Sequence, residues 1–190
     1  MSDKRRFLIT GGSQGIGAAT VEAAREAGHD VVFTGRNQEL IEQVAGDLAG
    51  NPEASISTIA TPLVATGEFF DVNVVKVVTD RAGFALYFSR APIPWDRDLL
   101  NNGVKALPIG IVPLRHIGIY AYRAGYLRRY AQMRPCPLEQ AEQLEQLRAL
   151  WYGERIHVAE ASQRPGPGVD TEDDLVIAEQ LLQAKINGDN

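Results

Sequence analysis

Hydrophobic residues in the first part of the chain alternate between strand-length runs and longer stretches with helical spacing. Residues 7–9 and 30–34 are short apolar runs that predict two strands. Residues 18–27 between them are rich in alanine and glutamate, which favour a helix. Asn37 is suited to cap a further helix. The apolar face of that helix would hold Leu40, Ile41, Val44 and Leu48. This part of the chain therefore predicts a βαβα unit.

The remainder of the chain predicts more strands, a β-hairpin and three helices. Strand-like runs occur at residues 55–59, 74–78, 84–89, 115–122 and 155–159. Residues 80–83 suit the hairpin connection between two of these runs. Residues 97–114 have no regular pattern, and we expect a flexible loop there. A helix follows the fourth run, Pro137 suits the first turn of the next, and Thr171 begins the last. The middle helix has an apolar stripe of Leu138, Ala141, Leu144, Leu147 and Leu150.

Strands that alternate with helices in this way are typical of an α/β fold. We expect a three-layer α/β/α sandwich with a Rossmann-like, largely parallel sheet, from which the β-hairpin departs as an excursion. A turn at residues 50–52 marks a seam between residues 1–50 and residues 51–190. The two parts are expected to pack together as one domain.

Composition and charge narrow the classes of partner. The 190 residues carry a formal net charge of −5, which does not attract nucleic acid or an anionic membrane surface. No apolar run approaches the roughly 20 residues that span a bilayer. Cys136 is the only cysteine, so an internal disulfide is impossible and a cytoplasmic location is expected. Small molecules are the partners that this composition favours.

A glycine-rich turn follows the first strand and precedes the first helix. Glycines let the backbone approach a ligand closely, and the amides and dipole at a helix N-terminus favour phosphate. The turn therefore predicts a dinucleotide-type or phosphate-binding loop. Its candidate binding residues are Thr10, Gly11, Ser13, Gly15, Ile16 and Gly17.

Arg36 follows the second strand, where a Rossmann fold meets the adenosine ribose of a dinucleotide. An arginine there suits a 2′-phosphate, so one interpretation is a preference for NADP. The other interpretation is a solvated loop arginine, and the sequence favours neither.

Residues 1–50 resemble the start of the short-chain dehydrogenase/reductase family, on the basis of Thr10-Gly11, Gly15-Ile16-Gly17 and residues 34–37. The chemistry of that family uses a Tyr-x-x-x-Lys pair, in which the lysine lowers the pKa of the tyrosine. None of the six tyrosines in this sequence is followed by lysine at the fourth position. The Asn-Ala-Gly element of the family is also missing. Dehydrogenase chemistry is therefore not expected.

Residues 51–190 resemble the C-terminal part of the 3-deoxy-manno-octulosonate cytidylyltransferase (CMP-Kdo synthetase) family. The resemblance rests on five separate stretches, which are residues 73–78, 87–95, 115–122, 144–148 and 168–171. It implies an enzyme in which the anomeric hydroxyl of a sugar acid attacks the α-phosphate of CTP, with Mg²⁺ neutralising phosphate charge. It also implies a homodimer.

The resemblance gives roles to particular residues of this chain. Asp170 would be a Mg²⁺ ligand, and four residues would face the sugar acid. These four are His116, Tyr120, Glu145 and Gln146. From the residues alone each has a purely structural alternative. His116 and Tyr120 share a strand face and could be polar residues at the edge of a core, whereas Glu145 could lie on a solvated helix face and Asp170 could support a helix cap.

The sequence lacks two motifs that the resemblance would require in the N-terminal half of the enzyme. These are a phosphate loop ending in a Leu-Pro-Gly-Lys-type turn and a Gln-Gly-Asp-Glu element with a metal carboxylate. The leading interpretation is therefore an engineered chimera without intact catalytic activity, which could retain weak NADP or phosphate binding at the glycine turn. The alternatives are a CMP-Kdo synthetase-like nucleotidyltransferase and, third, an NADP-dependent oxidoreductase.

Overall fold

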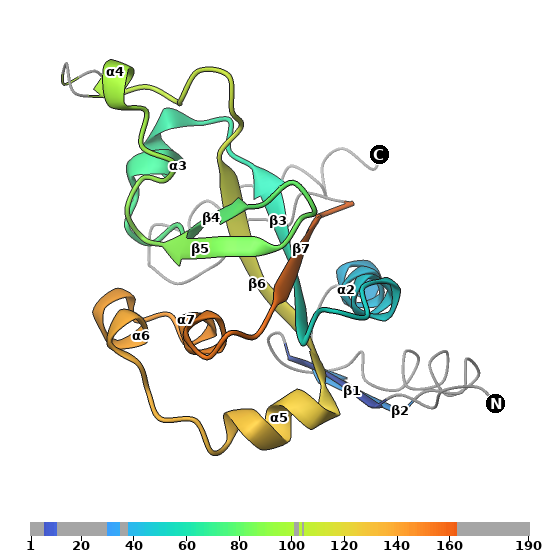
Figure 1. The fold of residues 1–190 in the computed structure, drawn as a ribbon. Helices are drawn as coiled ribbons and strands as arrows, with labels where there is room; N and C mark the ends of the chain where they lie inside the picture. Colours follow the sequence, from blue (N-terminus) through green and yellow to red (C-terminus); the bar gives the residue numbers. More distant parts are fainter. Residues whose placement is uncertain (1–5, 11–29, 35–37, 101–102, 104, 163–190) are drawn as a thin grey trace, which may run out of the picture.

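The computed structural model describes residues 6–10, 30–34, 38–100, 103 and 105–162 (Figure 1). The strands are β1 (Arg6–Thr10), β2 (Asp30–Thr34), β3 (Ile56–Pro62), β4 (Lys76–Thr79), β5 (Ala85–Ser89), β6 (Leu114–Arg123) and β7 (Ile156–Glu160). The helices are α2 (Gln38–Gly50), α3 (Thr66–Phe70), α4 (Arg97–Leu100), α5 (Ala124–Tyr130), α6 (Pro137–Glu142) and α7 (Gln146–Trp151). The predicted strands agree with these bounds to within a few residues. Residues 97–114, predicted as a loop, contain the single turn of α4.

The seven strands of the described residues belong to one sheet, whose main path has the order β2-β1-β6-β3-β7. The pairs β1–β2 and β3–β7 are parallel, whereas β6 runs antiparallel to both β1 and β3. Four of the five strands on this path therefore point in one direction and β6 points in the other. The β4–β5 hairpin is joined to the sheet through the pairing of β4 with β6. The predicted α/β class with a Rossmann-like sheet and a hairpin excursion is confirmed.

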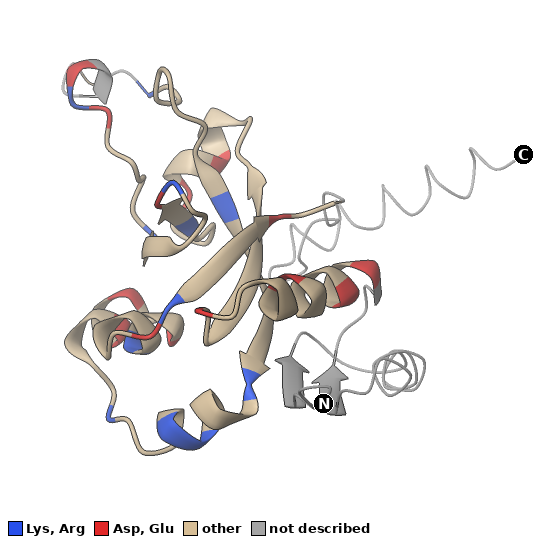
Figure 2. Cartoon of the chain, turned by 45° about the vertical axis from the view of Figure 1, so that its right-hand side comes forward, with Lys and Arg blue, Asp and Glu red and all other residues tan. Residues whose placement is uncertain are grey.

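Two hydrophobic clusters pack against the sheet, one beneath α2 and the other beneath α5 and α7. Figure 1 shows α2 on one side of the strands and α5, α6 and α7 on the other. Helix α2 packs by the predicted stripe of Leu40, Ile41, Val44 and Leu48, all of them fully buried. Acidic residues cover its outer side, including the exposed Glu39 and Glu42 (Figure 2). The sheet and the helices on its two faces form the three layers of the predicted sandwich.

Arg123, the last residue of β6, holds the C-terminal end of α2 against the sheet. Its guanidinium donates to the carbonyl oxygens of Leu48 at 2.7 Å, Asn51 at 2.9 Å and Ala54 at 2.6 Å. The last carbonyls of a helix have no partner within the helix, and a cation there also complements the helix dipole. One half-buried side chain thereby joins the predicted seam to the central strand.

The predicted helix over residues 137–150 is divided in two in the structure. Helix α6 ends at Glu142, and the next residue, Gln143, has a φ of 54° and a ψ of 47°, which place it in the left-handed region. A non-glycine residue in that region interrupts the helical hydrogen bonds, and α7 starts three residues later. Only the second half of the predicted apolar stripe is buried: Leu144 and Leu147 lie in the core, whereas Leu138 and Ala141 of α6 are exposed. The loop between α6 and α7 carries residues 143–145 to the edge of the sheet.

No helix in the described part of the chain is long and apolar enough to cross a bilayer.

Candidate functional site

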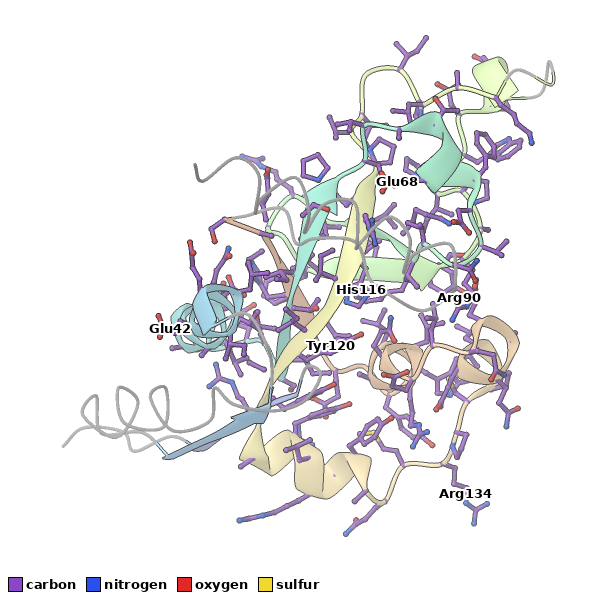
Figure 3. All side chains as sticks on the ribbon, turned by 180° about the vertical axis from the view of Figure 1, so that it is seen from behind. Glu42, Glu68, Arg90, His116, Tyr120 and Arg134 are labelled. Carbon is purple, nitrogen blue, oxygen red and sulfur yellow. The ribbon has the colours of Figure 1, made fainter. Side chains whose placement is uncertain are left out.

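A cavity of about 290 Å³ lies between β6, the segment before β4, the end of β5 and the loop that joins α6 to α7. Its lining includes all four residues that the sequence predicted for the sugar acid, which are His116, Tyr120, Glu145 and Gln146. Arg90 and Arg115 also line the cavity. Figure 3 shows His116 and Tyr120 on β6, with Arg90 beside α6. Residues from four separate segments of sequence thus meet in one place.

An irregularity in β6 brings His116 and Tyr120 together. In an extended strand, residues four positions apart are separated by about 13 Å. Here the ring centroids of His116 and Tyr120 are only 5.3 Å apart. The register explains the approach, because Thr58 pairs with Tyr120 whereas the next residue, Ile59, pairs with Ile117. Gly118 and Ile119, which lie between Ile117 and Tyr120, therefore have no partner residue in β3. As in a β-bulge, this shortens the strand and changes the direction of the side chains on either side.

Thr58 fixes the tautomer of His116. Its Oγ1 lies 2.7 Å from the carbonyl oxygen of Ile119, 3.2 Å from that of Ile117 and 2.9 Å from Nε2 of His116. A hydroxyl has one proton, and a carbonyl oxygen can only accept. Because the Thr58 proton goes to a carbonyl, Nε2 of His116 must carry a proton and donate to Oγ1. In neutral His116, Nδ1 is then an acceptor, and it makes no hydrogen bond to another described residue.

Burial keeps His116 neutral. The residue is 9% exposed and its ring packs edge-to-face on Phe88, with the centroids 5.0 Å apart. Desolvation of the charged form lowers the pKa of His116 to about 3. At neutral pH the imidazole therefore offers the cavity a hydrogen-bond acceptor and no positive charge.

Tyr120 contributes a phenol that stays protonated. It is 6% exposed, and its ring stacks on that of Tyr122 with the centroids 5.6 Å apart. Burial is the main reason that the pKa of Tyr120 lies well above its usual value, and the neighbouring Tyr122 and Glu145 act in the same direction. The hydroxyl can therefore donate a hydrogen bond to a ligand at any physiological pH.

Glu145 and Gln146 reach the cavity because the helix is interrupted before them. Gln146 begins α7 and is 5% exposed, whereas Glu145 is exposed. The stripe of apolar residues gave no sign of this interruption, because a left-handed residue is not specified by hydrophobic spacing. Glu145 and Gln146 therefore line the cavity even though the predicted helix was wrong in extent, and their role as site residues stays a prediction.

Two arginines of the cavity were not among the predicted site residues. Arg115 makes an ion pair with Glu68 at 2.9 Å, which neutralises much of its charge. Arg90 makes no ion pair with a described residue that the structure records. Both arginines lie in stretches that carry the family resemblance. Arg90 directly follows a predicted strand, and Arg115 directly precedes His116. These positions in the sequence could have marked them as candidate site residues.

Several predicted site residues fall outside the described part of the chain. These are Gly11, Ser13, Gly15, Ile16, Gly17, Arg36 and Asp170. Thr10 is described as the last residue of β1, where it pairs in register with Tyr120 of β6. The glycine turn thus follows directly, in sequence, from a residue paired with one that lines the cavity. Among the described residues there is no group of three or more His, Cys, Asp or Glu side chains that could hold a metal ion.

Comparison with known proteins identifies the family. The sequence profile of the family described as Cytidylyltransferase matches residues 30–156. This chain belongs to the cytidylyltransferase family. It is 57% identical over 145 residues to 3-deoxy-manno-octulosonate cytidylyltransferase of Proteus mirabilis (strain HI4320), a match that covers 76% of this chain and 56% of the relative. The enzyme of the same name from Idiomarina loihiensis (strain ATCC BAA-735 / DSM 15497 / L2-TR) is 54% identical over 143 residues, covering 75% of this chain and 56% of the relative.

A solved structure supports the same assignment. The chain resembles CMP:2-keto-3-deoxy-manno-octonic acid synthetase complexed with CTP, with a TM-score of 0.64, 26% sequence identity, and coverage of 88% of this chain and 78% of the other. The cytidylyltransferase chain described here spans about half the length of the curated relatives that it matches.

These comparisons correct the leading interpretation drawn from the sequence. An engineered chimera without catalytic activity was the wrong conclusion, because the homology is strong and supports the alternative of a CMP-Kdo synthetase-like cytidylyltransferase. The profile match crosses residues 50–52, where the sequence suggested a seam. These relatives give no support to a dehydrogenase segment or to NADP binding.

Proposed function

We propose that this cytidylyltransferase transfers the cytidylyl group of CTP to 3-deoxy-manno-octulosonate, releasing pyrophosphate. The main observation in support is that one cavity is lined by His116, Tyr120, Glu145 and Gln146 together with Arg90 and Arg115. Relatives that are 54–57% identical bear the name of this activity. The predicted roles of these residues are part of the proposal.

The chemistry of the cavity supports a polyhydroxylated acid as its ligand. A sugar acid carries one carboxylate, which calls for a cation, and several hydroxyls, which need both donors and acceptors. Arg90 supplies positive charge. The neutral imidazole of His116 and the carboxylate of Glu145 supply hydrogen-bond acceptors. Tyr120 and Gln146 supply donors. The proposed orientation has the carboxylate on Arg90 and the hydroxyls on the residues of β6 and α7.

The reaction forms a bond between the anomeric oxygen of the sugar acid and the α-phosphorus of CTP, while the bond from that phosphorus to the bridging oxygen of pyrophosphate breaks. The attacking hydroxyl loses its proton. Side chains of this cavity would act by holding that hydroxyl in line with the phosphorus, since positioning supplies much of the rate of phosphoryl-type transfers. Mg²⁺ bound by Asp170 remains part of the proposal, but the described residues include no matching ligand cluster, so no step is assigned to it.

The glycine turn at residues 11–17 is proposed to bind the phosphates of CTP. Thr10 pairs with Tyr120, and the turn begins at the next residue. A glycine-rich sequence with free backbone amides suits phosphate oxygens. This assignment would bring the triphosphate to the end of β6 that holds the cavity. Phosphate binding is thus retained from the sequence analysis, with CTP in place of NADP.

The first experiment is an assay of pyrophosphate release by the full chain with CTP, 3-deoxy-manno-octulosonate and Mg²⁺. We expect release that depends on both substrates. Gly15→Val should raise the KM for CTP at least about tenfold, because a side chain would obstruct a phosphate loop, and should leave the KM for the sugar acid unchanged. No release by a chain that melts cooperatively would contradict the proposed activity. Equal effects on both KM values would contradict the role of the turn.

A homodimer is also part of the proposal. Exposed apolar side chains are concentrated in residues 64–112, which include the β4–β5 hairpin; they are Val64, Val72, Leu86, Trp95, Ile109, Ile111 and Val112. Among the described strands β5 pairs along its length only with β4, and its other side is bridged to β7 only at Phe84, just before the strand begins. An apolar surface beside a largely unpaired edge suits a second copy of the chain. The cytoplasmic location and the exclusion of nucleic acid and membrane partners stay predictions.

Sedimentation tests the dimer. The wild-type chain should have twice the mass of one chain, and the double variant Leu86→Lys/Val112→Lys should have the mass of one, because burying lysines without partners is costly. Trp151→Lys is a matched control, since Trp151 is 54% exposed but lies on α7, outside this region. A dimer that survives the double variant would place the interface elsewhere.

A further inference from the structure

Arg90 is bound by other residues at four of its polar groups. Its backbone N–H donates to Oε2 of Glu142 at 2.9 Å, and its Nε donates to the backbone carbonyl of the same residue at 2.8 Å. Nη1 donates to the carbonyl oxygen of Val72 at 3.0 Å, and the carbonyl of Arg90 accepts from Lys76. Nη2 makes no hydrogen bond to any other described residue. The guanidinium is therefore held along one side and open along the other, at a residue that lines the cavity.

Lys76 is a fully buried lysine with no carboxylate as its direct partner. Its Nζ donates to the carbonyl oxygens of Asp71 at 2.8 Å, Val74 at 2.6 Å and Arg90. An ammonium group has three protons, so these three acceptors satisfy it completely. Burial lowers the pKa of Lys76, and the nearby Asp71 and Glu142 oppose that shift. Burying a charged ammonium costs free energy. Here the buried ammonium of Lys76 connects the backbone of Arg90 to the loop before β4, and that loop forms one wall of the cavity.

Glu142 makes the corresponding connection from the other side. Its carboxylate accepts from Oγ of Ser89 at 2.6 Å and from the backbone N–H of Arg90. Burial raises the pKa of Tyr87, and the nearby carboxylate of Glu142 acts in the same direction. Glu142 is the last residue of α6 and precedes Gln143, where the chain turns toward the cavity. The side chain therefore fixes the end of β5 relative to the loop that carries Glu145 and Gln146.

We propose that Lys76 and Glu142 are positioning residues for Arg90, holding its guanidinium so that Nη2 faces the cavity and binds the carboxylate of the sugar acid. The identity of that ligand rests on the proposed function, whereas the positioning itself does not. Neither residue touches the substrate. Each acts by removing rotamers that Arg90 would otherwise adopt, so that less conformational entropy is lost on binding.

The test uses the full chain labelled with ¹⁵N-arginine, with the Arg90 Nε–H signal assigned by its loss in Arg90→Lys. Glu142→Gln and Lys76→Met each weaken a contact to the backbone of Arg90, and the resulting freedom should loosen the bond from Nε to the main-chain carbonyl of residue 142. We expect each variant to speed the exchange of the Nε proton with water about tenfold, the net worth of about one hydrogen bond. Calorimetric titration with 3-deoxy-manno-octulosonate should show the Kd rising about tenfold in the same variants. Glu142→Gln serves if Lys76→Met fails to fold.

Glu139→Gln is the matched control. Glu139 lies on the same helix, closes the capping box with Cys136 and pairs with Arg148, but does not contact Arg90. It should lower the melting temperature without changing the Arg90 exchange rate or the Kd. If Glu139→Gln and Glu142→Gln act alike, or if the Arg90 signal does not respond, the positioning role is wrong. If the Arg90 signal responds as expected while wild type neither binds the sugar acid nor releases pyrophosphate, the positioning role stands and the proposed function fails.

Discussion

Replacing Arg90 by glutamine is expected to lower kcat/KM for 3-deoxy-manno-octulosonate about a hundredfold, because a charge-assisted hydrogen bond to a carboxylate is worth about 1.5–3 kcal/mol. Arg115 cannot take over, since Glu68 lies 2.9 Å from it. The loss should appear in the KM for the sugar acid, and the KM for CTP should stay within about twofold of wild type. Initial-rate kinetics with each substrate varied in turn measure both.

Two matched variants make the Arg90 result specific. Arg115→Gln removes the same charge from the same cavity, and the existing ion pair predicts a loss of less than about tenfold. Arg134→Gln removes an exposed arginine that lies away from the cavity (Figure 3), and no change is expected. Equal losses for Arg90→Gln and Arg115→Gln would contradict the assignment of the carboxylate to Arg90. A loss confined to the KM for CTP would do the same.

His116 is expected to make the fold sensitive to mild acid. Its pKa of about 3 in the folded chain lies below the ordinary value of 6.5, so between these values the unfolded state binds one more proton than the folded state. Stability from this group is complete above pH 6.5 and falls as the pH drops toward 3. The slope is about 1.4 kcal/mol per pH unit, so the free energy of unfolding should decrease by about 2 kcal/mol between pH 6.5 and pH 5.

Urea denaturation of His116→Gln at several pH values isolates this effect. The amide of glutamine can still donate to Thr58 but does not titrate in this range. His29 and His157 are present in both proteins, so their contributions cancel in the difference. Most carboxylates titrate below about pH 4.5 and fall outside the window. The difference in unfolding free energy should depend on pH with the stated slope, and parallel curves for the two proteins would show that His116 is not buried in neutral form.

The elements of this fold follow from local sequence to a large extent. Helix α2 was predictable because four apolar residues at helical spacing must face a core. The β4–β5 hairpin was predictable because Asp80 and Gly83 suit its turn, in which Oδ1 of Asp80 accepts from two backbone amides and Gly83 has a φ of 83°. Both signals lie within a few residues of the structure that they determine.

The family resemblance in residues 51–190 named four residues that the structure brings together in one cavity, but the conclusion drawn from the missing motifs was wrong. Two motifs missing from the N-terminal half were taken to exclude activity, although residues 51–190 carried the family resemblance. The similarity to known cytidylyltransferases shows that this resemblance was the better guide. A missing motif concerns only the part of the chain in which it was expected. The cavity of His116, Tyr120, Glu145 and Gln146 is built by another part.

The sequence by itself determined the α/β class, most strands and four of the residues that line the cavity, because hydrophobic spacing, turn residues and family motifs are local properties of the chain. Tertiary structure alone decided that β6 runs against its neighbours and that an irregularity in it brings His116 within 5.3 Å of Tyr120. It also decided that α6 ends at Glu142, before the left-handed Gln143, and that Lys76 and Glu142 hold Arg90. These features depend on hydrogen bonds between segments far apart in sequence, whose partners no local pattern specifies.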